Sequence, residues 1–268
     1  KNSFKLFLNM NQEIFREYDI RGIAETDMPT GDMELIGKAY GTLIHNSGGS
    51  TVIVGNDNRE SGPRILEALK KGILSTGINI IYIGEIPTPL LYYAVNKLDM
   101  DGGISVTASH NPPEFNGFKV MIGKDAIFGE KIREIGTLAE AGEFVKGKGT
   151  YSEKSLDEQY LNEIVSNVNI KNKPKFVIDA GNGMASEIAP KLFEKLGLTP
   201  TCLFCKKDSS FPNHIADPTQ EKNVKDLSKK VLEEKAEYGI AFDGDVDRIG
   251  IVDETGKMIF GDKLLGVF

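Results

Sequence analysis

The feature that most constrains the fold is an alternation of short apolar runs with amphipathic segments, which occurs twice along the chain. In the first half, helical patterns open at Ser61 and near Pro87, and strand patterns occupy 51–55, 78–83, 103–106 and 118–122. In the second half, helical patterns at 156–168, 186–196 and 224–236 alternate with strand patterns at 176–179, 198–205, 238–242 and 249–252. This order predicts an α/β protein made of two consecutive three-layer α/β/α domains with mixed, mostly parallel sheets.

The length of 268 residues fits about two domains at roughly 150 residues each. A segment rich in Gly and Lys at 142–150 reads as a hinge, so we expect a first domain at 1–150 and a second at 151–255. Residues 256–268 are then the start of a truncated third domain. The chain begins at Lys1 without Met and stops within an apolar stretch, so we expect the front part of a longer protein.

Composition excludes several classes of protein. Apolar residues make up 40% and charged residues 26% of the chain, which argues against a disordered or fibrous protein. Apolar runs such as 78–83 are far shorter than the roughly 20 residues of a membrane span. The net charge is −7 and no basic stripe is present, so we expect neither nucleic acid nor membrane as a partner. An anionic ligand must therefore be held by a few local Lys and Arg residues.

The two cysteines, Cys202 and Cys205, form a C-x-x-C pattern that suggests redox chemistry or zinc. A zinc site needs about four ligands, and no second Cys/His pair is present. A thioredoxin-like pair belongs on the turn into a helix, whereas this pair lies in the strand-like run 198–205. We therefore expect buried, inert thiols. With no signal peptide at the amino end, this points to the cytoplasm.

A glycine-containing turn at 179–183 follows one predicted strand and precedes a helix, as a dinucleotide fingerprint does. The third glycine position holds Ser186, however, and no acidic residue ends the next strand. A tight strand-to-helix turn is the better interpretation.

The most informative cluster is Asp243, Asp245 and Asp247, with a carboxylate at every second position directly after a strand pattern. Their mutual repulsion is unfavourable unless a cation lies among them, and carboxylates are hard oxygen ligands. The spacing also fits an EF-hand, with Glu254 at position 12, but position 6 requires Gly and holds Arg248. The flanking strands exclude an EF-hand as well.

An enzymatic alternative remains open for the same cluster. It resembles the D-x-D start of a haloacid-dehalogenase phosphatase, in which Asp243 would be a phosphorylated nucleophile and Asp245 an acid/base. The fifth position of that motif is Thr or Val, whereas this chain has Asp247. A loop at 107–113, Thr-Ala-Ser-His-Asn-Pro-Pro, follows the third predicted strand and by itself reads as a turn.

Together, three segments give a specific resemblance: Phe-Arg-Glu-Tyr-Asp-Ile-Arg-Gly at 15–22, the loop at 107–113 and the acidic cluster at 243–248. The chain resembles the α-D-phosphohexomutase superfamily, and most closely its bacterial phosphomannomutase/phosphoglucomutase branch. Segments 116–120 and 211–214 also look like family sequence. Ile215 and Ala216 depart from it, because relatives commonly carry His-Pro there, and this weakens any role for the 206–223 loop.

The resemblance implies a set of functional residues. Ser109 would carry a phosphoryl group and, with Asp243, Asp245 and Asp247, would hold one Mg²⁺. His110, Lys119, Arg21 and Arg248 would surround that centre as catalytic residues, with Lys119 assisting proton transfer.

The implied reaction interconverts hexose 1-phosphate and 6-phosphate, of mannose and/or glucose, through a hexose 1,6-bisphosphate that is also the activator. Alternatives are a phosphoglucosamine mutase and a non-catalytic phosphosugar-binding protein. Glucosamine phosphate relatives usually differ at 15–22, so mannose and glucose rank first. The family has four domains, so we expect this fragment to be inactive without the missing C-terminal domains.

Overall fold

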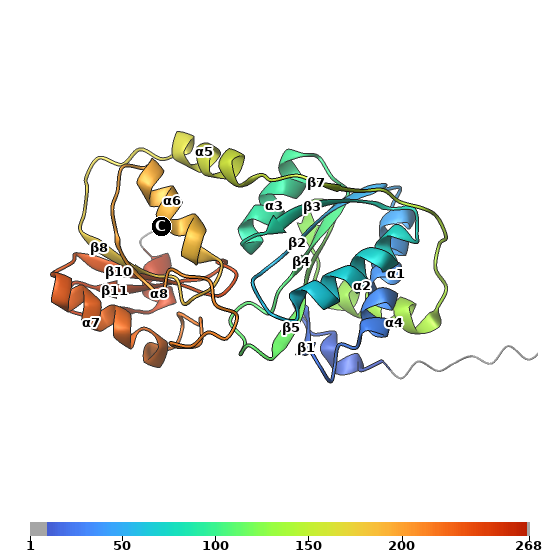
Figure 1. Ribbon diagram of the computed structural model, residues 1–268, viewed down its shortest axis with the longest axis horizontal. Helices are drawn as coiled ribbons and strands as arrows, with labels where there is room; N and C mark the ends of the chain where they lie inside the picture. The colour runs from blue at the N-terminus through green and yellow to red at the C-terminus, as the bar shows by residue number, and fades with distance from the viewer. Residues whose placement is uncertain (1–9, 267–268) are drawn as a thin grey trace, which may run out of the picture.

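The structure is a computed structural model that describes residues 10–266, and within them it contains two sheets flanked by helices (Figure 1). The first, sheet A, has the strand order β1 (Ile20–Ile23), β5 (Phe115–Ile122), β4 (Gly102–Val106), β2 (Thr51–Asn56), β3 (Asn79–Glu85) and β7 (Tyr151–Glu153). Strand β6 (Asp125–Ala126) pairs with β5, which runs antiparallel to its neighbours, while β4, β2, β3 and β7 are parallel.

Sheet A is covered by helices on both faces. One face carries the larger core and the helices α1 (Thr30–Asn46), α2 (Gly62–Leu74) and α4 (Glu130–Ala141). The other face is covered by α3 (Thr88–Lys97) through Leu90, Leu91 and Val95, which pack against Ile53 and Met121. Because helices cover both faces of the sheet, strands such as β2 and β4 are buried on both faces and consist mostly of apolar residues.

Sheet B has the order β12 (Met258–Ile259), β11 (Ile249–Asp253), β10 (Tyr238–Phe242), β8 (Phe176–Asp179) and β9 (Thr201–Leu203). Strands β10, β8 and β9 are parallel, and β11 and β12 complete an antiparallel edge. Helix α7 (Lys225–Glu234) packs on one face and α6 (Ala185–Lys195) on the other. The remaining helices are α5 (Asp157–Asn167), α8 (Gly261–Leu265) and the 3₁₀ helices at Gln12–Ile14 and Glu221–Asn223.

The predicted fold class is confirmed: two α/β/α units with mixed sheets. The predicted hinge at 142–150 contains no helix or strand and packs on the first unit, where Gly147 and Gly149 donate to the carbonyls of Ser75 and Leu74. Strand β7 follows and still belongs to sheet A. The divisions at residues 150 and 255 stay predictions, and residues 267–268 of the predicted third domain lie outside the described residues.

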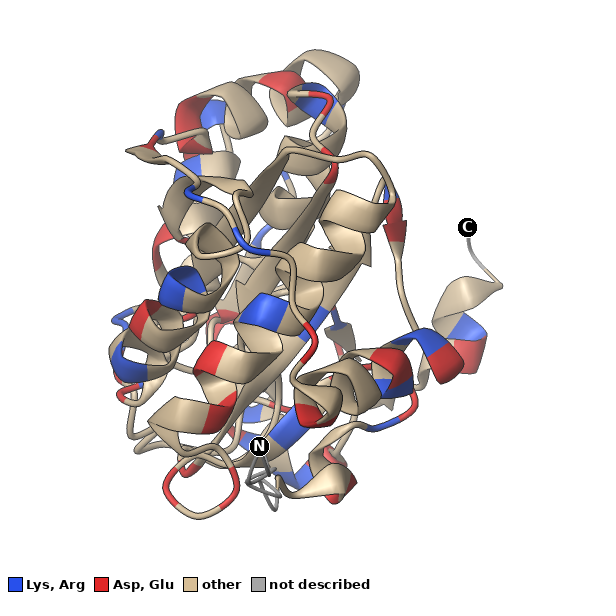
Figure 2. Ribbon diagram, turned by 90° about the vertical axis from the view of Figure 1, so that its right-hand side faces the viewer, with Lys and Arg blue, Asp and Glu red and all other residues tan. Residues whose placement is uncertain are grey.

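Basic and acidic residues are interspersed along the helices (Figure 2). Among residues 10–266, no helix is both long enough and apolar enough to cross a membrane.

Helices α1 and α2 approach each other closely at two glycines, and this contact generates a stability prediction. A Cβ at Gly72 would lie 2.2 Å from the carbonyl oxygen of Glu34, and one at Gly37 would lie 2.4 Å from that of Leu69. We expect Gly72→Ala to lower the free energy of unfolding by about 1–3 kcal/mol, because overpacking outweighs the better helix propensity of Ala.

Gly31→Ala in α1 is the matched control, because a Cβ there meets no atom within 4 Å. It should raise stability by about 0.4–1 kcal/mol. Urea unfolding of the two variants checks both signs, and equal effects would contradict the close approach of the helices.

Candidate active site

Two loops from different sheets meet at the ends of their central strands. One loop follows β4 and carries Ser109, and the other joins β10 to β11 and carries Asp243. The Ser109 hydroxyl donates to Asp243 Oδ2 over 2.6 Å, and both residues are at most 1% exposed. A serine hydroxyl and a carboxylate that are 134 residues apart in sequence are thus in direct contact.

Both loops hold backbone conformations that side chains disfavour. Ser109 has φ 51° and Val246 has φ 65°, in the left-handed region that is sparsely populated by residues other than glycine. Between the acidic residues, Gly244 lies so close to the other loop that a Cβ would be 2.3 Å from the Ser109 carbonyl oxygen. Only glycine at position 244 allows this approach, and strain of this kind is concentrated at functional sites.

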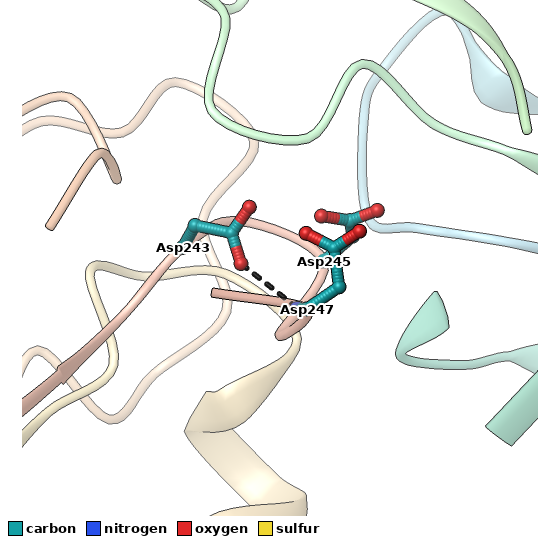
Figure 3. A group of neighbouring side chains, drawn as sticks. All are labelled: Asp243, Asp245 and Asp247. Carbon is teal, nitrogen blue, oxygen red and sulfur yellow. Dashed lines mark hydrogen bonds between the residues drawn. The ribbon is translucent and has the colours of Figure 1, made fainter. Parts of the chain in front are cut away.

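The three aspartates are arranged as in Figure 3, each offering one oxygen within 4.8 Å of the others. Asp243 Oδ1 accepts the backbone N–H groups of Asp247 and Arg248, both at 2.9 Å. Asp245 Oδ2 accepts the Thr88 hydroxyl at 2.5 Å and the Lys119 ammonium at 2.7 Å. The same ammonium also pairs with Asp247, the most exposed of the three.

The donor set fits a small, hard divalent cation. Three carboxylates supply only oxygen ligands, and no Cys or His belongs to the group. Asp245 Oδ1 is buried and has no hydrogen-bond partner, as expected for an oxygen whose partner is a metal ion. Asp243, Asp245 and Asp247 could therefore hold a divalent metal ion, and the Ser109 hydroxyl lies against Asp243.

The pKa values of Asp243 and Asp245 are shifted in opposite directions. Burial, together with the charges of Asp245 and Asp247, raises the pKa of Asp243 to about 8. Burial also disfavours the charged form of Asp245, but the Lys119 ammonium outweighs it and holds the pKa of that carboxyl below its usual range. Burial by itself would lower the pKa of Lys119, and its two aspartate partners raise it well above the ordinary value.

The other predicted site residues, His110, Arg21 and Arg248, contact the Ser109 loop or Asp243 in different ways. His110 Nδ1 is 3.3 Å from the Ser109 hydroxyl, and burial followed by the charge of Arg248 lowers the pKa of His110. Arg21 is buried and donates to Asn111 in the Ser109 loop over 2.6 Å and to Asp19. Arg248 contributes its backbone N–H to Asp243, and its exposed side chain makes no ion pair within residues 10–266.

Sequence reasoning missed two residues that complete the site. Thr88 at the start of α3 supplies its hydroxyl to Asp245, and its backbone N–H donates to the Asp245 carbonyl over 2.9 Å. Asn111 links Arg21 to the loop of Ser109. The prolines at 87 and 89 mark a helix start, but no local pattern indicates which distant residue its hydroxyl will meet.

The prediction of buried, inert thiols is wrong. Cys202 and Cys205 are joined by a disulfide, and Cys202 is exposed. The physical reason is that β9 ends at Leu203 and Phe204 takes φ 52°, so the chain turns and brings the two cysteines together. The predicted strand at 198–205 is correspondingly shorter.

The turn at 179–183 forms the tight strand-to-helix connection that was expected. Asp179 Oδ1 accepts the N–H of Gly181 at 2.9 Å, and α6 begins at Ala185. Asp179 Oδ2 lies 3.0 Å from Nε2 of His214, which fixes part of the 206–223 loop beside the turn.

Comparison with protein-family models gives two matches in chain order. The model for phosphoglucomutase/phosphomannomutase alpha/beta/alpha domain I matches residues 12–146, and the model for domain II of the same family matches residues 158–256. The first match includes Ser109 and the second includes the three aspartates.

Individual relatives agree with these matches. A phosphoglucomutase of Neisseria meningitidis serogroup A is 39% identical over 97% of this chain and 57% of its own length. A phosphomannomutase/phosphoglucomutase of Pseudomonas putida is 41% identical over 95% of this chain and 55% of its own length. A solved phosphoglucomutase/phosphomannomutase family protein from Burkholderia thailandensis superposes with a TM-score of 0.93 at 37% identity, covering 97% of this chain and 58% of its own. The chain thus spans little more than half the length of these relatives.

The raised pKa of Asp243 generates a prediction about metal binding. Below a pH of about 8 the Asp243 carboxyl retains a proton, and binding of Mg²⁺ requires the carboxylate. Binding should therefore release up to one proton, and the affinity should rise about tenfold per pH unit between pH 6 and 8 before levelling off.

Calorimetric titration of Mg²⁺ in buffers of different ionisation enthalpy measures the proton release directly. Asp243→Asn should bind Mg²⁺ more weakly and without this pH dependence. Equal Kd values for the unsubstituted protein at pH 6 and pH 8 would contradict the assignment.

Proposed function

This chain belongs to the phosphoglucomutase/phosphomannomutase family, and from that membership we propose that the whole protein is a phosphohexomutase. It interconverts the 1- and 6-phosphates of glucose and/or mannose through a phosphoserine at Ser109. The observation that carries this proposal is the 2.6 Å contact of the Ser109 hydroxyl with Asp243, inside a group of three carboxylates.

In the proposed reaction, the phosphoryl group passes from Ser109 to the free hydroxyl of a bound hexose phosphate, and the proton of that hydroxyl ends on the Ser109 oxygen. The resulting hexose 1,6-bisphosphate reorients, and the phosphoryl group at its other end returns to Ser109. Mg²⁺ would neutralise charge on the transferred phosphoryl oxygens. The strained loop of Ser109 holds the nucleophile in place, so the chain contributes mainly position and charge.

The basic residues supply the opposing charge. Lys119 is protonated while Asp245 and Asp247 hold it, and we infer that it assists proton transfer at the sugar hydroxyl. Arg21 and Arg248 would orient the phosphoryl group or the substrate, and His110 lies beside Ser109. The charges of the three aspartates and of a phosphoserine, about −2, are nearly cancelled by those of Lys119, Arg21, Arg248 and a divalent metal.

The phosphatase alternative is disfavoured by the contacts of Asp243. In its ionised form, one oxygen of Asp243 accepts the Ser109 hydroxyl and the other accepts two backbone N–H groups, so both oxygens are occupied. The family matches point the same way. The cytoplasmic location, the bisphosphate activator and the C-terminal domains that complete the substrate site remain parts of this proposal.

A phosphorylation assay tests the proposal. The full-length protein incubated with glucose or mannose 1,6-bisphosphate should carry one phosphoryl group on Ser109, detected by intact mass and peptide mapping. Ser109→Ala should lose the label and reduce mutase turnover by at least 10³-fold, because no other group can carry the phosphoryl between the two ends.

Asp245→Asn is the companion variant, because it removes one carboxylate charge and leaves Ser109 in place. It should be labelled slowly and bind Mg²⁺ weakly. A label on an aspartate, or full activity of Ser109→Ala, would overturn the proposal.

Residues 1–268 alone should bind Mg²⁺ yet show no appreciable conversion of hexose 1-phosphate to 6-phosphate. Retention of a bisphosphate during its reorientation requires groups on its distal phosphate, and the chain spans little more than half of its relatives. A coupled assay beside the full-length protein, with bisphosphate supplied, measures the difference. Comparable rates would show that these 268 residues suffice.

A further inference from the structure

Arg59, which follows β2, is a buried cation to which neither the sequence motifs nor the proposed reaction assigns a role. It is 2% exposed, and all five of its guanidinium N–H groups have acceptors. Nε donates to Asp57 Oδ2 over 3.2 Å, and the two terminal nitrogens donate to four backbone carbonyls at 2.7–2.9 Å, those of Ser109, Asn111, Pro112 and Phe115.

Three of these carbonyls, those of Ser109, Asn111 and Pro112, belong to the Ser109 loop, and the fourth, that of Phe115, is the first of β5 directly after it. Because their oxygens converge on one point, they repel one another unless a cation lies there. The planar fork of a guanidinium suits such a set of acceptors, whereas the single ammonium of lysine has three donors and no fixed plane. The loop is therefore folded around Arg59, including Ser109 with its left-handed backbone.

The same short segment also contacts the second unit of the protein. The Asn58 amide donates to the Asn182 carbonyl over 3.0 Å, at the start of the turn into α6. The Phe211 ring, from the 206–223 loop, lies 5.3 Å from the Arg59 guanidinium carbon in a cation–π contact. Residues 57–59 thus connect the Ser109 loop to the half of the molecule that carries the aspartates.

We propose that Arg59 is a positioning residue for phosphoryl transfer: it fixes the Ser109 oxygen against the carboxylate cluster without touching the reacting atoms. This role rests on the proposed function, in which Ser109 is the group that gives and receives the phosphoryl. Arg59 donates only to Asp57 and to backbone carbonyls, so its effect reaches the reaction through the shape of the loop.

Arg59→Lys in the full-length protein tests the role, since it keeps the charge and removes the fork. We expect kcat to fall about 10- to 100-fold, the range that small misplacements of a reacting group produce, with KM within about threefold of the original. The rate at which the bisphosphate phosphorylates Ser109 should fall by the same factor as kcat.

Arg64→Lys is the matched control. Arg64 also donates to backbone carbonyls, those of Met28 and Ala24, but these lie outside the Ser109 loop. It should keep kcat within about twofold, while thermal unfolding reports any loss of stability in either variant. Equal kcat values for the original protein and a folded Arg59→Lys, or equal losses in both variants, would overturn the positioning role.

A readout without turnover separates this inference from the proposed function. Hydrogen exchange at the amides of Ser109 and Asn111, which donate to Thr107 Oγ1 and the Ala108 carbonyl, should accelerate at least tenfold in Arg59→Lys and not in Arg64→Lys. If the unsubstituted protein shows no mutase activity but exchange still accelerates in Arg59→Lys, the proposed function is refuted and the loop function of Arg59 stands. Unchanged exchange refutes the loop function.

If Arg59→Lys does not fold, Phe211→Leu carries the test, because it removes only the ring on the guanidinium. A lower kcat at unchanged KM then supports the positioning role, and an unchanged kcat overturns it.

Discussion

The hydrogen bond between the Ser109 hydroxyl and Asp243 is the contact on which the arrangement of this molecule depends. It joins the carboxyl ends of central strands in two separate sheets, where ligands of open α/β folds are commonly held. It also places a buried serine hydroxyl beside three carboxylates, of which those of Asp243 and Asp245 are buried. Such a concentration of like charge needs cations, and Lys119 provides one from β5. Each sheet therefore supplies what the other lacks: one the serine hydroxyl and the ammonium, the other the carboxylates.

The contact between the two loops requires backbone strain in each of them. Ser109 and Val246 take left-handed conformations, and Gly244 touches the carbonyl of Ser109. Conformations of this kind cost of order 1–3 kcal/mol each and persist only where surrounding contacts determine them. The guanidinium of Arg59 on one loop and the backbone N–H groups on Asp243 in the other are such contacts. The two loops are consequently fixed before any ligand arrives.

The sequence predicted the elements whose signals are local. Strands β8 and β10 have the predicted bounds, because each is a short apolar run with polar residues on both sides. Helices α1 and α4 were not predicted: glycines interrupt the apolar stripe of α1, and in the structure those glycines make the close contact with α2. The carboxylate cluster was predicted from spacing and its serine partner from resemblance. Thr88 and Arg59 were beyond prediction, since Asp245, the partner of Thr88, lies 157 residues away and the backbone carbonyls that Arg59 binds lie at least 50 residues away.

Lys119 connects the electrostatics of the site to its chemistry. Its ammonium is held by Asp245 and Asp247, and these are also two of the three carboxylates that would hold a metal. Lysine and a divalent cation therefore compete for the same oxygens. While Lys119 has both carboxylates its pKa is raised and its proton is retained. Once the carboxylates are shared with a cation of higher charge, the influence that raises the pKa of Lys119 weakens, while the burial that lowers it remains. If the proposed metal is bound, Lys119 would therefore hold its proton less tightly than it does beside the two carboxylates alone.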